Sequence, residues 1–249
     1  MSIEQGLAGG RPVLAPMTAR DRGRDHRFFT GMAAAAALTV FVGFAPTYYL
    51  RGLAGSPPLP GLVHLHGVVF TAWMLLFLAQ TSLVSAGRTD LHRRLGIGGA
   101  VLAALIIVLG YATAIEAARR GVRPPGGPPP LVFLSVPLGA LVAFTVLAGT
   151  GLSFRGRSET HKRLMLLATL ALVAPALARM RFIGEGGPPA AIGGTGLFVA
   201  ACLIYDRAAH SRVHPAFLWG GLFLLLSLPV RAAVGHTDAW LAVAGWLTR

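Results

Sequence analysis

Several uninterrupted apolar runs divide this chain, and each is long enough to form a helix that crosses a lipid bilayer. About 18 to 20 mostly apolar residues suffice for such a helix, because the hydrocarbon layer is about 30 Å thick. Only 12% of the 249 residues are charged, whereas a soluble domain has about twice that fraction. We therefore predict about seven spanning helices, at 28–50, 61–86, 95–118, 131–153, 164–183, 190–209 and 215–235.

The predicted fold is an all-α polytopic transmembrane bundle built from repeated helical hairpins. A helix satisfies its own backbone hydrogen bonds, which hydrocarbon cannot do, so apolar runs of this length fold as helices. Three parts follow in order: a basic N-terminal tail over 1–27, the seven-helix domain over 28–235 and a C-terminal segment over 236–249. That last segment is too short to span and carries Trp240 and Trp246, which favours a position in the membrane interface.

One polar motif occurs twice and indicates that a hairpin has been duplicated. Residues 87–95 read GRTDLHRRL and residues 156–164 read GRSETHKRL, and each copy precedes an apolar run. A blurred third copy, RVHP, begins at Arg212. In the first two copies Thr89 and Ser158 are predicted helix N-caps, each followed by an acid that suits the positive end of the helix dipole.

The basic residues predict the orientation of the chain. With the N-terminus inside, most of the 22 lysines and arginines fall in the N-terminal tail and in the turns that carry the motif. The opposite loops, which start near Gly55, Pro124 and Gly184, are rich in proline and glycine. The positive-inside rule then predicts a multi-pass membrane protein with a cytoplasmic N-terminus.

The formal net charge of +13 is explained by this orientation and by contact with the lipid bilayer, including its anionic lipids. The basic residues are split among short loops, and no basic domain presents them together. We therefore predict no nucleic-acid partner.

The second apolar run carries an aromatic stripe with a polar residue at each end. His66, Phe70, Trp73, Phe77 and Gln80 recur at helical spacing and therefore share one face. A histidine or glutamine against lipid is costly, so this face is predicted to turn into the bundle.

Three charged residues near the opposite ends of helices are candidate intramembrane sites: Glu116, Arg179 and Arg231. In one interpretation Glu116 pairs with Arg179, which would neutralise two buried charges. In the other, the arginines extend to the interface and only hold helix ends in place. Pro175 and Pro229 stand close before the two arginines and predict local kinks.

His92 and His161 occupy matching positions in the two motif copies and are the first candidates for a cofactor site. Histidines on facing transmembrane helices are the usual axial ligands of b-type haem, and nearby arginines suit its propionates. His66 and His214 are further candidates for cofactor binding, and the only possible partners for His66 are His64 and His236.

Zinc bound by His92, His161 and His214, the histidines of the three motif copies, is a second interpretation. The acids close to them are Asp90, Glu159 and Asp206. The His-x-x-x-His pair His210 and His214 is followed by Pro215, which disfavours helical geometry at His214. We therefore predict no metal site.

Residues 61–248 resemble uncharacterised bacterial polytopic membrane proteins. The resemblance rests on LVHLHGVVFTAWMLLFLAQTSLVSAGRTDLHRRLG, with its His-aromatic and Leu-His-Arg-x-Leu-Gly signatures, and on HKRLMLLATLAL and RVHPAFLWGG. It implies an all-helical inner-membrane fold and makes His66, His92 and His161 the positions to test. A more distant likeness to transmembrane b-type cytochromes rests on the histidine-bearing helices alone.

These patterns predict an integral membrane protein with a haem- or quinone-linked redox role, and so a quinone or another membrane redox partner. A small-solute or lipid transporter is the alternative, because transporters combine repeated hairpins, proline-broken helices and a few buried charges. A non-catalytic membrane assembly protein is a third hypothesis, and it would need no binding site.

Overall fold

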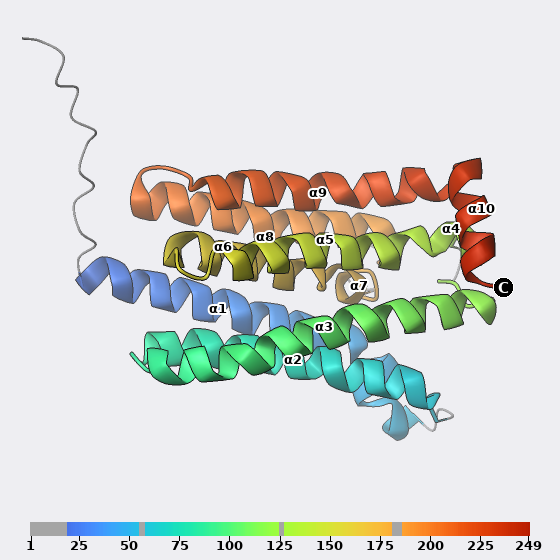
Figure 1. Cartoon of the computed structure of the whole chain (residues 1–249), viewed down its shortest axis with the longest axis horizontal. Helices are drawn as coiled ribbons and strands as arrows, with labels where there is room; N and C mark the ends of the chain where they lie inside the picture. Colours follow the sequence, from blue (N-terminus) through green and yellow to red (C-terminus); the bar gives the residue numbers. More distant parts are fainter. Residues whose placement is uncertain (1–18, 55–57, 125–126, 181–185) are drawn as a thin grey trace, which may run out of the picture.

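The computed structural model of the protein shows long helices running side by side along one axis (Figure 1). It describes residues 19–54, 58–124, 127–180 and 186–249. Over these ranges the chain is all-helical and has no strand, as the sequence predicts. Six helical segments are long and apolar enough to cross a membrane: Asp21–Tyr49, Gly61–Ser85, Thr89–Arg119, Pro130–Ser153, Gly187–His210 and Pro215–Gly235.

The first of these segments joins two kinds of helix. Helix α1, Ala19–Phe44, continues into the π-helical turn η1, Ala45–Tyr49, where Pro46 interrupts the regular hydrogen-bond ladder. A short 3₁₀ turn η2, Arg51–Ala54, follows. Because α1 begins at Ala19, the helix includes the end of the predicted N-terminal tail, and residues 1–18 lie outside the described ranges.

Three helical hairpins follow α1, and their tight turns lie at the end of the bundle where α1 begins (Figure 1). The hairpins pair α2 with α3, α5 with α6, and α8 with α9. Their bounds are α2 Gly61–Ser85, α3 Thr89–Arg119, α5 Ser135–Ser153, α6 Ser158–Ala171, α8 Gly187–His210 and α9 Pro215–Gly235. The predicted repeat of hairpins is therefore present, and the three histidine-bearing turns share one end, called the motif end below.

The predicted N-caps of α3 and α6 are wrong. Thr89 and Ser158 are the first helical residues, and neither helix has a side-chain cap. After α2 the chain reverses at Gly87, whose φ of 73° suits a residue without a Cβ.

The predicted span at 164–183 is interrupted. Helix α6 ends at Ala171, and α7, Ala174–Leu177, forms a separate single turn. Pro175 has no N–H to continue the ladder, and α6 ends one turn before it, about three turns earlier than the hydropathy pattern indicates. This broken segment is the reason that six helices, rather than seven, are long and apolar enough to span.

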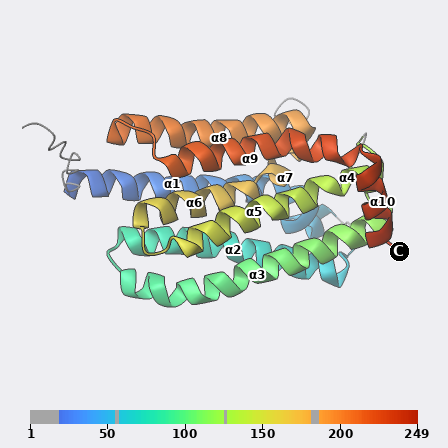
Figure 2. The same ribbon diagram turned by 45° about the horizontal axis from the view of Figure 1, so that its top comes forward.

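The broken segment lies at the centre of the bundle. Figure 2 shows α6 and α7 between the α8–α9 hairpin and the α2–α3 hairpin. Leu166, Leu167, Leu170 and Val173 are fully buried, whereas the outer helices expose many large apolar side chains. Non-helical backbone at membrane depth is tolerated where protein surrounds it, and this is the situation of the residues between α6 and α7.

The opposite end of the bundle carries two further short helices, α4 at Pro130–Phe133 and α10 at Asp238–Leu247. Helix α10 turns across the end of the bundle (Figure 1). The Trp240 Nε1–H donates to the carbonyl oxygen of Leu131 at 2.8 Å, whereas Trp246 is exposed. The interfacial position of residues 236–249 stays a prediction.

Candidate functional site

The two motif histidines meet between the α2–α3 and α5–α6 hairpins. The ring centroids of His92 on α3 and His161 on α6 are 6.3 Å apart, and their planes cross at 80°. His161 Nδ1 lies 2.8 Å from the carbonyl oxygen of Gly151. A carbonyl only accepts, so Nδ1 of His161 carries the proton and Nε2 of the neutral ring keeps its lone pair. The ring is thus held in a form that can bind a metal or accept a hydrogen bond.

Gln80 lies beside His92. Among the described residues, Gln80 Oε1 and His92 Nδ1 are buried side-chain atoms without a hydrogen-bond partner. A Cβ placed on Gly96 of α3 would lie 3.8 Å from Gln80 Nε2, so α2 and α3 approach closely at this level. Because most buried polar atoms in proteins are paired, these two atoms mark a place where a ligand would gain hydrogen bonds.

The aromatic stripe of α2 turns into the bundle, as predicted, at its middle. Trp73 is 3% exposed, donates from Nε1 to Thr169 Oγ1 at 3.3 Å and packs edge-on against Phe144. His66 packs on Phe70 with ring centroids 4.1 Å apart, and its buried Nδ1 has no partner among the described residues. The stripe therefore links the polar group His66 to the His92 and Gln80 region through a buried tryptophan.

A second polar centre at the motif end joins α6 to α8. Nε and Nη2 of Arg163 lie 2.9 Å and 2.6 Å from the Asp206 carboxylate, and Nη1 lies 2.7 Å from Glu159 Oε2. The Arg163 side chain is 2% exposed and that of Asp206 is fully buried. A two-pronged guanidinium to carboxylate contact is the strongest form of such a pair.

Asp25 extends this centre to α1. Lys162 Nζ lies 2.5 Å from Asp25 Oδ2 and 2.8 Å from Glu159 Oε1. Tyr205 donates its hydroxyl hydrogen to Asp25 as well. We call Asp25, Glu159, Lys162, Arg163 and Asp206 the Arg163 network. The network ties α1, α6 and α8 together. It contains three carboxylates and two cations, so its formal net charge is negative.

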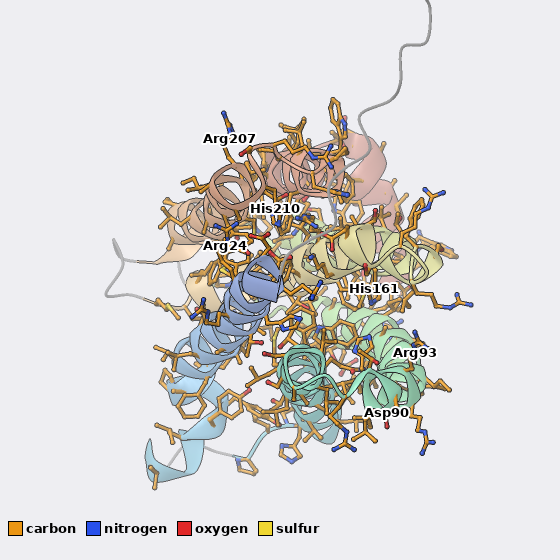
Figure 3. The ribbon with its side chains drawn as sticks, turned by 90° about the vertical axis from the view of Figure 1, so that its left-hand side faces the viewer. Arg24, Asp90, Arg93, His161, Arg207 and His210 are labelled. Atoms are coloured by element: carbon orange, nitrogen blue, oxygen red, sulfur yellow. The ribbon has the colours of Figure 1, made fainter. Side chains whose placement is uncertain are left out.

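His210 lies beside two carboxylates of the network. Its Nε2 lies 3.2 Å from Asp25 Oδ1, and its Nδ1 lies 3.4 Å from Asp206 Oδ1. Figure 3 looks onto the motif end and shows His210 and His161 towards the middle, with Arg207 at the rim.

His214 belongs to the Arg163 network and not to the pair of His92 and His161. Its backbone N–H donates to Asp206 Oδ2 at 2.9 Å, and its Nδ1 accepts from the N–H of Ala216 at 3.1 Å, which caps α9. Zinc bound by His92, His161 and His214 would require all three side chains to converge. They do not, because His214 lies apart from the other two. Over the described ranges no group of three or more His, Cys, Asp or Glu side chains could hold a metal ion.

The pKa values of Glu159 and His214 are moved by their surroundings. Burial alone would raise the pKa of Glu159, but hydrogen bonds from Lys162 and Arg163 lower it below its ordinary value. Burial, together with the Arg163 guanidinium, lowers the pKa of His214. Both effects favour an ionised Glu159 and a neutral His214 in the folded protein.

The candidate charges at the opposite end do not pair as expected. Glu116 binds Arg120 on its own helix, with Oε1 2.5 Å from Nε, because residues four apart on a helix are neighbours. Arg179 stacks over the Phe44 ring at 4.5 Å and donates to the Pro175 carbonyl at 2.7 Å. The interpretation that Glu116 neutralises Arg179 is therefore wrong.

Arg231 does not extend to the surface. It is 5% exposed, and its Nη2 donates to Ser227 Oγ at 2.7 Å. Its Nε is buried and has no partner among the described residues. Protein therefore surrounds the Arg231 side chain, and its position at the membrane interface stays a prediction.

The sequence analysis missed Asp25, Lys162 and Tyr205 as parts of a site. One signal was present: Asp206 is an acid in an otherwise apolar run, and such a charge is costly without a partner. The choice of Arg163 as that partner depends on how α6 and α8 are rotated, which the spacing of residues along each helix does not contain.

No protein-family model, curated protein or solved structure matches this chain. Its class therefore rests on its own fold and site. These define an integral, multi-pass membrane protein of three helical hairpins, with two polar centres at the motif end.

Proposed function

We propose that this membrane protein has a redox role and that His92 and His161 bind haem b as its two axial ligands. The observation that carries the proposal is the separation of their ring centroids, 6.3 Å. A metal to imidazole bond of about 2 Å puts each ring centre about 3 Å from the metal, so two opposed imidazoles on one metal lie about 6 Å apart. A haem bound there would supply one-electron transfer.

The residues around the pair support this assignment through their hydrogen-bonding roles. The carbonyl of Gly151 holds His161 with Nδ1 protonated and Nε2 free, which is the form that binds iron. Exposed arginines of both turns, Arg93 and Arg157, lie at the same end and could pair with propionates. One cavity is lined by Val213 and another by Arg231, and neither includes His92 or His161. A porphyrin would therefore bind between the two histidines only if the α2–α3 hairpin separated from α5 and α6.

A quinone is the second redox partner that the site would accept. Gln80 Oε1 and the unpaired Nδ1 of His92 offer hydrogen bonds to a hydroquinone, and the neighbouring aromatic stripe offers an apolar surface to its ring. Both forms of the proposal depend on His92, and they differ in whether the purified protein absorbs visible light.

The absorption spectrum of the purified protein tests the proposal. We expect a Soret band that shifts on reduction with dithionite and disappears in His92→Ala and in His161→Ala. The matched control is His236→Ala, which removes an exposed imidazole at the opposite end of the bundle. A preparation that is colourless after expression with added haem precursor would contradict the haem assignment. Quinone extracted from that preparation and lost in His92→Ala would then support the quinone form.

A transporter for a small solute or a lipid is the second candidate function. One observation favours it: the central helix is broken between Ala171 and Ala174 inside the protein. Transporters use such breaks to expose backbone groups to a bound solute. The test is thermal stabilisation of the purified protein by a panel of solutes and lipids, repeated with Arg179→Gln and with the matched control Arg120→Gln. A ligand that stabilises the control but not Arg179→Gln would support transport.

We also propose that the motif end faces the cytoplasm of a bacterial inner membrane. The turns of all three hairpins lie together at this end, and so does the start of α1. The excess of basic residues in these segments supports the orientation through the positive-inside rule.

A further inference from the structure

A groove between α5 and α9 contains a buried arginine that no acid among the described residues neutralises. The groove has a volume of about 440 Å³, and its walls are mainly apolar side chains, among them Leu138, Val142, Leu226 and Val230. Val142, Leu226 and Val230 are exposed on the outside of the bundle, in the part of the chain that spans the membrane. The groove therefore opens sideways, towards lipid.

Arg231 lies at the end of this groove that is nearer to α10. It stands one helical turn before the end of α9, at Gly235, and about 24 Å along the helix axis from Pro215. Trp240 of α10 also lines the groove. Tryptophan is typical of the depth at which lipid headgroups begin, so the guanidinium lies close to the headgroup level of the leaflet opposite the motif end.

The guanidinium is held in place but not neutralised. Its Nη2 bonds the neutral Ser227 hydroxyl, its Nε is buried without a partner, and no ion pair to Arg231 occurs over the described ranges. Its side chain crosses α5 at Gly139, where an added methyl group would collide with it. A buried, unpaired cation is costly, so a bound anion at this position would stabilise the protein.

We infer that this groove binds a membrane lipid with an anionic headgroup. The Arg231 guanidinium binds the phosphate, Ser227 supports it, and one acyl chain lies along Val142 and Leu226. The charge of the arginine selects the headgroup, and the apolar walls make free phosphate a poor substitute. The site is separate from the His92 and His161 pair, which lies at the motif end.

Lipid binding to the full chain in neutral detergent tests the inference. Thermal unfolding and native mass spectrometry are measured with dioleoyl phosphatidylglycerol, with dioleoyl phosphatidylcholine and with inorganic phosphate. We expect phosphatidylglycerol to raise the Tm and to stay bound, and the other two to do neither. Arg231→Gln should weaken phosphatidylglycerol binding by about tenfold, because it removes a charge-assisted hydrogen bond. Arg231→Lys should retain part of the binding.

Two further variants complete the test. Arg123→Gln removes an exposed arginine outside the groove and should leave binding unchanged. Val142→Trp fills the groove while Arg231 stays in place, so it keeps the test decisive if Arg231→Gln does not fold, and it should also weaken binding. Equal stabilisation by phosphatidylcholine, stabilisation by phosphate alone, or unchanged binding in Val142→Trp would each overturn the inference.

Discussion

Arg163 and Asp206 form a buried ion pair between α6 and α8, with Nη2 of the guanidinium 2.6 Å from Oδ1 of the carboxylate. The corresponding arginine of the first motif copy, Arg94, is exposed on α3. Two copies of one motif therefore have different roles, because α6 lies at the centre of the bundle and α3 lies at its edge. The pair is a better candidate for holding the bundle together than any surface contact of the first copy.

Removing the guanidinium from the centre should cost far more stability than removing it at the edge. Arg163→Met leaves Asp206 buried with an unbalanced charge, so we expect a loss of about 3–5 kcal/mol in the free energy of unfolding. Arg94→Met, at the matching position, should change it by less than about 0.5 kcal/mol. Unfolding in mixed micelles, followed by circular dichroism, measures both. Similar losses for the two variants would contradict the assignment of the pair.

Acidification should weaken the same region in two steps. His214 has a lowered pKa in the folded protein, so its contribution to stability is complete above about pH 6.5 and falls as the pH drops below that value. Glu159 also has a lowered pKa, and its contribution is complete above about pH 4.5 and is lost in more acidic solution. When the pH is lowered from 8 to 4, the Tm should therefore begin to fall below about pH 6.5, where the contribution of His214 is lost.

The first step can be assigned with one substitution. His214→Asn keeps a side chain that can accept the hydrogen bond from Ala216, yet does not titrate. The variant should lose the dependence of Tm on pH just below pH 6.5 while keeping the more acidic step. An unchanged profile in His214→Asn would contradict the assignment of the first step to His214.

Replacing Gly43 or Gly31 of α1 by alanine should change the stability of the protein in different ways. A Cβ on Gly43 would lie 2.7 Å from Cα of Ala176, so Gly43→Ala pushes α1 away from α7 and should lower the stability. Gly31 has nothing within 4 Å of its Cβ position, and Gly31→Ala should be neutral or should stabilise by up to about 1 kcal/mol. Thermal unfolding of the two variants, side by side, checks the packing of α1 on α7.

The shared side of the hairpin turns can be measured with a membrane-impermeant thiol reagent. In a Cys202→Ala background, Arg88→Cys and Arg157→Cys should react only after the inner membrane is opened. Arg123→Cys, at the opposite end, should react in intact cells. Positions 88 and 157 labelled from different sides would contradict the arrangement of the hairpins, and both labelled from outside would reverse the proposed orientation.

The helices were predictable because their cause lies in the local sequence. Apolar runs of sufficient length form helices in lipid whatever their neighbours, and a repeated polar motif marks where each hairpin turns. The proline at position 175 is visible in the sequence. Whether a helix breaks there depends on whether protein surrounds the interrupted backbone, which the sequence does not show. The hydropathy pattern of 164–183 therefore predicted one continuous span, where the structure has two short helices around a buried interruption.

The candidate site was predictable only in part. His92 and His161 come together because the duplication puts them at equal depth, and equal depth can be inferred from spacing. The partners of Arg163 and Arg179 depend on how neighbouring helices are rotated about their axes. That rotation is set by the packing of the whole bundle, so the ion pair of Arg163 was missed and the interpretation that pairs Arg179 with Glu116 was wrong.

The short central helix α6 also constrains the order in which this chain can be completed. During synthesis α6 leaves the ribosome before α8, so Arg163 is made before the carboxylate that will neutralise it. A helix of 14 residues that begins with charged side chains is a weak substrate for insertion on its own. We expect α6 to take its final place only when the last hairpin arrives and brings Asp206 with it.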